Sequence, residues 1–155
     1  MPQFKTSKEA FLECERDGFL VKQEEIDRAK IKHMLAIALA DFEAAKSLIP
    51  GITKQSLQWS TIYKLCYDAL HQLAEAFVRL GRRIKSNNHQ CLFAYLCEKH
   101  PELEFDWGFL EKIRTKRNGI QYYGEPTAYE DWKSIELQLN IYINTLKKAI
   151  EEKLR

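Results

Sequence analysis

The chain has 155 residues, of which 45% are hydrophobic, so a single domain with a substantial core is expected. Its 6 glycines and 4 prolines are too few for a collagen-like, linker-rich or many-turned all-β protein. A net charge of +2 excludes a histone-like or acidic-tail protein, and it neither requires nor forbids nucleic acid as a ligand.

Helix start and stop signals predict two helices in the first third of the chain. The segment Thr6-Ser7-Lys8-Glu9 fits a capping box with Thr6 as N-cap, and Gly18 ends the short helix that follows. A longer helix is expected from about Lys22 to Ile49, because its apolar residues keep a helical spacing. Pro50-Gly51 stops this second helix.

A third helix is expected from about Gln55 to Leu80, with Gly81 as its C-cap. It carries two neighbouring apolar stripes, and a helix that is apolar on more than one side belongs at the centre of a bundle. A fourth helix is expected from about Asn88 to Lys99, with Asn87 as its N-cap.

The last two expected helices complete an all-α fold. One runs from about Phe105 to Ile120, and the other begins with a second capping box, Thr127-Ala128-Tyr129-Glu130. No segment shows the two-residue alternation of a strand. The sequence therefore predicts an antiparallel up-and-down helical bundle with additional short helices, formed by residues 1–155 as one domain.

Two features bear on where the protein works. No run of about 18 apolar residues predicts a membrane span, and Met1 to Lys8 lacks the apolar stretch of a secretory signal. We therefore expect a cytoplasmic protein without membrane partners. In a reducing cytoplasm all cysteines are expected to be free thiols, namely Cys14, Cys66, Cys91 and Cys97.

One residue breaks the apolar pattern of the fifth expected helix. At 100° per residue, Phe109, Ile113 and Ile120 share a face, and Arg117 lies about 40° from Ile113 on that face. A guanidinium there is costly unless it is paired or opens onto a wet cleft. Two interpretations stay open: Arg117 extends its head to water, or it lines a polar pocket that recognises phosphate.

Basic and aromatic residues surround Arg117 in the sequence. Arg114 and Lys116 precede it, and Tyr122 and Tyr123 follow it. Basic residues beside aromatic rings are typical of proteins that bind single-stranded RNA or nucleotides. The alternative is a solvated run of charge at a helix C-terminus, where the helix dipole favours cations.

The sequence predicts no metal site and no cofactor. His89, Cys91, Cys97 and His100 lack the spacing of a zinc knuckle. No glycine-rich phosphate loop is found. His71 neighbours the tyrosines of the third expected helix, and a satisfied core histidine is the prediction for it.

The segment from Arg117 to Gly124 resembles the motif of the HEPN family, the higher eukaryotes and prokaryotes nucleotide-binding domain. In that motif, an arginine that is usually followed by asparagine precedes a histidine after a gap of four to six residues. Tyr63 to Leu70 resembles the aromatic-rich second long helix of the family, and Asn88 to Leu96 resembles the shorter helix after it. The resemblance covers roughly Lys22 to Leu154.

The resemblance implies a helical bundle that forms a homodimer, with the motif in a cleft between the two protomers. Family members are often metal-independent ribonucleases, toxins of toxin–antitoxin pairs or partners of a small nucleotidyltransferase. Arg117 and Asn118 match the motif, whereas Tyr122 occupies the position of the acid/base histidine. A tyrosine with the reference pKa of about 10 is a poor base at neutral pH.

These observations predict a dimeric HEPN-like module that is non-catalytic or weakly catalytic. It would bind RNA or a nucleotide through Arg114, Arg117 and Tyr123. Two alternatives stay open. One is an active metal-independent endoribonuclease that uses Arg117, Asn118 and Tyr122, and the other is a structural bundle that binds another protein.

Overall fold

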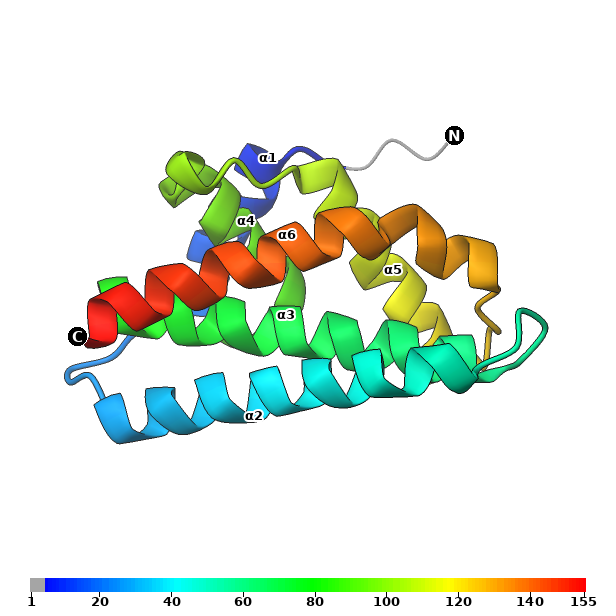
Figure 1. Cartoon of the computed structure of the whole chain (residues 1–155). Helices are drawn as coiled ribbons and strands as arrows, with labels where there is room; N and C mark the ends of the chain where they lie inside the picture. Colours follow the sequence, from blue (N-terminus) through cyan, green and yellow to red (C-terminus); the bar gives the residue numbers. More distant parts are fainter. Residues whose placement is uncertain (1–4) are drawn as a thin grey trace.

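Helices form most of the structure, a computed structural model that describes residues 5–155 (Figure 1). The six helices of this part of the chain are α1 (Ser7–Arg16), α2 (Arg28–Leu48), α3 (Gln58–Arg82), α4 (His89–Lys99), α5 (Trp107–Tyr123) and α6 (Tyr129–Leu154). The predicted all-α class is confirmed. The expectation that Met1 to Lys8 is not a secretory signal falls partly on residues 1–4, which lie outside the described part of the chain.

The third helix lies at the centre of the bundle, as its two apolar stripes predict. In Figure 1, α2 runs along one side of α3 and α6 along another, and both contact it. Tyr63, Tyr67, Leu70 and Leu73 of α3 are all at most 1% exposed. A helix that is apolar on several faces is stable only when neighbours cover those faces.

Contacts at the helix ends show the relative directions of the three long helices α2, α3 and α6. Arg28 at the start of α2 donates to the carbonyl of Lys153 at the end of α6, so these two helices are antiparallel. By contrast, the ring of Trp59 at the start of α3 contacts that of Tyr129 at the start of α6, and Gly81 lies beside Lys153 at their far ends. Because α4 and α5 carry the chain back, α3 and α6 run in the same direction.

A small antiparallel sheet replaces the expected beginning of the second helix. β1 (Leu20–Lys22) pairs with β2 (Ile84–Ser86), with Leu20 opposite Ser86 and Lys22 opposite Ile84. No strand was predicted, because three residues are too few to show an alternating pattern. α2 therefore begins only at Arg28, where the side chain of Asp27 accepts the Lys30 N–H.

Helix ends in the first half differ from the prediction by one or a few residues. The capping box of Thr6 and Glu9 is confirmed. α3 ends at Arg82, and its C-cap is Arg83, which adopts a left-handed conformation with φ 56°, in place of the predicted Gly81. α4 takes Asn88 as its N-cap in place of Asn87, and the Asn88 side chain accepts the Cys91 N–H.

The two last helices also begin or end at other residues than predicted. α5 continues to Tyr123, because Gly124 adopts the left-handed conformation that closes it. α6 begins at Tyr129, and the carboxylate of Asp131 accepts the Ala128 N–H in place of the predicted box that starts at Thr127. Short 3-10 turns at Ile49–Gly51 and Pro101–Leu103 follow α2 and α4.

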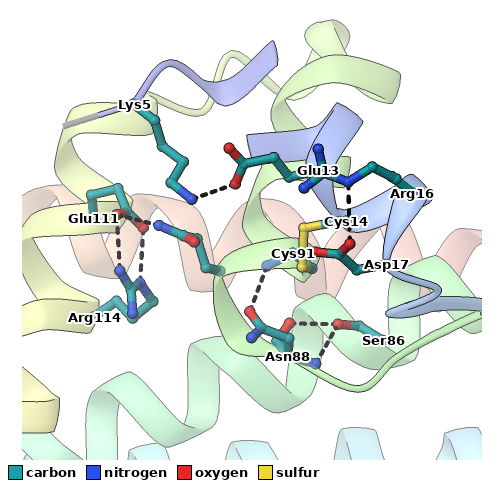
Figure 2. The surroundings of a disulfide bond; sticks show 11 residues. Lys5, Glu13, Cys14, Arg16, Asp17, Ser86, Asn88, Cys91, Glu111 and Arg114 are labelled. Atoms are coloured by element: carbon teal, nitrogen blue, oxygen red, sulfur yellow. Dashed lines mark hydrogen bonds and ion pairs between the residues drawn. A yellow bond between two sulfur atoms is a disulfide. The ribbon is translucent and has the colours of Figure 1, made fainter. Parts of the chain in front are cut away.

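A disulfide joins Cys14 of α1 to Cys91 of α4, so the prediction of four free thiols is wrong for this pair (Figure 2). α1 lies against α4, and the two Cα atoms are 5.7 Å apart, within the range a disulfide requires. Cys66 and Cys97 are the free cysteines of residues 5–155. A cytoplasmic location stays a prediction.

Within residues 5–155, no helix combines the length and the apolar character that a membrane span requires.

The disulfide is expected to contribute strongly to stability, because Cys14 and Cys91 are 77 residues apart in the sequence. Replacing both residues by serine should lower the free energy of unfolding by about 2–5 kcal/mol, since the unfolded chain gains freedom. Urea unfolding with and without a thiol reductant measures the effect. Cys97→Ser is the control and should keep the response to reductant. Equal stability of the parent protein in both conditions would contradict this prediction.

Candidate functional site

Arg117 of α5 points into the protein. Its side chain is 14% exposed, and its Nη2 lies 3.3 Å from Oδ1 of Asp68 on α3. The guanidinium also lies over the ring of Tyr67, with 5.6 Å between Cζ and the ring centre. Of the two interpretations of Arg117, the structure therefore shows the inward one, because an ion pair and an aromatic face receive the charge.

The ion pair of Arg117 leaves hydrogen-bonding capacity unused. The Nε of Arg117 is buried and has no hydrogen-bond partner among the described residues. Burial raises the pKa of Asp68, and the charge of Arg117 opposes that rise. A buried donor without an acceptor is uncommon in proteins.

A pocket of about 270 Å³ opens beside Arg117, and every residue that lines it is cationic or neutral. Its wall combines the second half of α5 with the first turn of α4 and the residues before it. The lining residues are Asn87, Asn88, His89, Gln90, Arg114, Arg117, Asn118 and Tyr122. All three predicted catalytic residues, Arg117, Asn118 and Tyr122, thus meet in one pocket.

A buried carboxylate fixes Arg114 in this wall. Arg114 Nε and Nη2 donate to the two oxygens of Glu111 at 2.8 and 2.9 Å (Figure 2). Gln90 donates to the same carboxylate at 2.9 Å and so connects α4 to α5. Glu111 is only 2% exposed, which is tolerable because three donors surround it. The pair leaves Arg114 Nη1 for a ligand.

The two tyrosines at the end of α5 lie differently. Tyr122 is 67% exposed, and its ring centre is 6.0 Å from Cζ of Arg117. Tyr123 is 78% exposed and lines an adjoining hollow of about 320 Å³ instead of the pocket. Of the predicted binding residues, Arg114 and Arg117 are therefore brought together, and Tyr123 lies to one side.

Two histidines that the sequence analysis did not assign to the site lie next to it. His89 lines the pocket, and its Nδ1 is 3.1 Å from the hydroxyl oxygen of Tyr67. The ring of His71 stacks on that of His89, with 3.7 Å between the ring centres. The sequence places His89 only at a helix start, so no local signal connects it to Arg117.

Both imidazoles are neutral at pH 7. Burial lowers the pKa of His71 to about 3, and the neighbouring His89 and Arg117 add to the effect. Burial also lowers the pKa of His89, followed by the charges of Arg117 and Arg114. A neutral imidazole can accept a proton or a hydrogen bond from a ligand.

A larger hollow of about 340 Å³ lies between α5 and α6, and it is a weaker candidate. Lys116 on its wall is 3.5 Å from the carboxylate of Asp131, so opposite charges offset each other there. Its lining residues are Tyr63, Gly108, Lys112, Thr115, Lys116, Glu125, Asp131 and Ser134.

The residues weighed as metal ligands do not form a cluster. Cys91 is bonded to Cys14, and His100 contacts Glu102 at 2.9 Å instead. Within residues 5–155, no three His, Cys, Asp or Glu side chains gather as a metal ion would require.

Comparison with protein-family models, with characterised proteins and with solved structures finds no match to this chain. The resemblance to the HEPN family stays a prediction.

The stacked histidines predict how stability depends on pH. The unfolded state binds a proton on His71 near pH 6.5, whereas the folded state does so only near pH 3. The free energy of unfolding should therefore decrease as the pH falls from 7.5 to 5, by up to about 1.4 kcal/mol per pH unit for this histidine. Urea unfolding at several pH values measures the slope.

A matched pair of variants separates this histidine from the others. His71→Phe should make the free energy of unfolding depend less on pH. The reason is that phenylalanine does not take up a proton in either the folded or the unfolded state. His33→Gln, which changes an exposed histidine of α2, should leave the slope as it is. Identical slopes for the parent and His71→Phe would show that the prediction is wrong.

Proposed function

We propose that this protein is a binding module for single-stranded RNA or a nucleotide, with the phosphate of the ligand seated beside Arg117. One observation carries the proposal: a guanidinium is held inward at a pocket whose lining is entirely cationic or neutral. A fixed planar guanidinium favours phosphate, since it can donate two parallel hydrogen bonds to it.

The donors left over from the internal ion pairs would face the ligand. Asp68 engages Nη2 of Arg117, and Glu111 engages Nε and Nη2 of Arg114. Nη1 of Arg117, Nη1 of Arg114 and the carboxamide of Asn118 would then supply the hydrogen bonds to phosphate oxygens. The carboxylates orient the arginines and limit the net charge of the site.

The first turn of α4 supports binding of an anion at the same place. His89 and Gln90 line the pocket at the N-terminal end of this 11-residue helix. The backbone dipoles give a helix N-terminus a partial positive charge and free N–H groups. This contribution adds to that of the two arginines and does not depend on side-chain charge.

The size of the pocket and the exposed ring of Tyr122 favour a nucleotide over a compact drug-like ligand. A pocket of about 270 Å³ is at or below the usual size for a whole small molecule. A phosphate and part of a sugar would fill it, and the base would stack outside on Tyr122, which is 67% exposed.

The wider proposal follows the HEPN resemblance. It comprises a cytoplasmic homodimer with the motif at the junction of two protomers, and a small nucleotidyltransferase as partner in a toxin–antitoxin pair.

Replacing Arg117 tests the binding function. Arg117→Ala should raise the Kd for a single-stranded oligoribonucleotide by about 10- to 100-fold, since hydrogen bonds to a charged group are lost. Fluorescence anisotropy at several salt concentrations measures the Kd and its salt dependence, which should be less steep in the variant. Arg117→Lys should lose part of the affinity, because the charge stays and the planar fork does not.

Arg16→Ala is the matched control, because it removes an arginine that is 72% exposed on α1. It should bind RNA as the parent protein does. An unchanged Kd in folded Arg117→Ala would contradict the proposal. A parent protein that binds no RNA or nucleotide but co-purifies with a protein would instead favour the structural alternative.

A further inference from the structure

We propose that the disulfide between Cys14 and Cys91 is a redox switch that sets the affinity of the pocket beside Arg117 for its ligand. The inference rests on the proposed binding function and goes beyond it, because it assigns a regulation that acts from outside the pocket. In the oxidised protein the disulfide holds one wall of the pocket in place, and reduction releases this wall. The redox partner is a soluble thiol–disulfide couple of the glutathione class.

The disulfide is attached to the turn of α4 that forms the pocket wall. Cys91 follows directly after His89 and Gln90, which both line the pocket. Its partner Cys14 belongs to α1, and α1 contributes no residue to the lining. The disulfide therefore fixes the pocket wall to an element that is distinct from the binding site, as the control of one site by another requires.

A chain of contacts leads from the disulfide to an arginine of the pocket. Gln90, the neighbour of Cys91, donates to the carboxylate of Glu111 at 2.9 Å. Glu111 also accepts two hydrogen bonds from Arg114, which lines the pocket. A shift of the first turn of α4 would remove one donor from this buried carboxylate and would so disturb the group that orients Arg114.

Apart from the disulfide, α1 is held to the bundle by a small contact surface. Its buried residues are Ala10, Phe11 and Cys14. Ser7 adds one hydrogen bond, to Glu98 of α4. A segment with few buried apolar contacts opens at a much lower free energy than the whole domain. Since both sulfurs are buried, a thiol reaches them when α1 opens, and the bundle need not unfold.

The reduction is a thiol–disulfide exchange in two steps. A glutathione thiolate forms a bond to Sγ of Cys14, the bond between the two cysteine sulfurs breaks, and Cys91 leaves as a thiolate at the start of α4, where the helix dipole favours negative charge. A second glutathione thiolate attacks the sulfur of the first, and Cys14 leaves as a thiolate. Each cysteine takes up a proton, so the pair gains two electrons and two protons while one glutathione disulfide forms.

The free thiols of residues 5–155 do not compete in this exchange. Burial raises the pKa of Cys66 and that of Cys97 to about 12. Both are therefore protonated at pH 7, whereas the thiolate is the form that attacks a disulfide. The redox change is confined to Cys14 and Cys91.

The experiment compares the Kd of a single-stranded oligoribonucleotide for the oxidised protein and for the same protein after reduction, by fluorescence anisotropy. Reduction should raise the Kd by about 5- to 50-fold, within the usual range for coupling between two sites. Cys14→Ser should bind as weakly as the reduced parent protein and should not respond to a reductant. Cys97→Ser is the matched control and should respond as the parent does.

A second measurement needs no variant. Because coupling is reciprocal, saturating RNA should make the disulfide harder to reduce by the same factor. The ratio of squared thiol to disulfide concentration of glutathione at which half of the protein is reduced should rise by the fold-change of the Kd. Alkylation of the thiols, followed by mass spectrometry of the peptides that contain Cys14 and Cys91, gives the reduced fraction.

Hydrogen exchange distinguishes release of one wall from loss of the whole fold. In the reduced protein without RNA, exchange should be faster in α1 and at the amides of Cys91 and Leu92, which donate to Asn88. The amides of the central helix α3 should stay as protected as in the oxidised protein. Loss of protection throughout α3 would show that reduction unfolds the bundle, and would overturn the switch.

The outcomes separate the two proposals. RNA that binds the folded reduced protein with the same Kd as the oxidised protein, or a lower one, overturns the switch and leaves the binding function in place. RNA that binds neither form overturns both proposals.

Discussion

The contact of Arg117 with Asp68 and Tyr67 is the constraint on which the site depends. A guanidinium on the inner face of α5 would be costly beside apolar neighbours alone. Asp68 and the face of Tyr67 both belong to the central helix α3, so this helix stabilises the charge. With this contact in place, Arg117 still lines the pocket. The ion pair thus joins α5 to α3 at the wall of the pocket.

The other wall of the pocket depends on how the start of α4 is held. Asn88 caps the helix, and the hydroxyl of Ser86 both donates to the Asn88 carbonyl and accepts its N–H (Figure 2). Ser86 ends the strand that pairs with Leu20, and Cys91 is bonded to α1 through Cys14. Elements distant in sequence therefore converge on one helical turn. This convergence positions His89, whose own side chain adds only one hydrogen bond.

The positive charges of the two pocket arginines are partly neutralised by carboxylates behind them. Each arginine at the pocket has a carboxylate behind it, Asp68 for Arg117 and Glu111 for Arg114. This arrangement lowers the attraction for anions at long range and raises the geometric demand on a ligand. In the proposed function, selection would depend on a phosphate that reaches the unused guanidinium donors and on a base that reaches Tyr122. A pocket with free cations alone would attract many anions without this discrimination.

The sequence by itself determined the helical class, the central position of α3 and the special character of Arg117. These features follow from local periodicity, in which each residue reports the face it occupies. It did not determine the disulfide between Cys14 and Cys91, the pairing of Leu20 with Ser86 or the place of His89 beside Arg117. These depend on which helices meet and in which direction they run. Only the tertiary structure decided them, because contacts between segments far apart in the chain arise from burying shared apolar faces and leave no periodic signal in either segment.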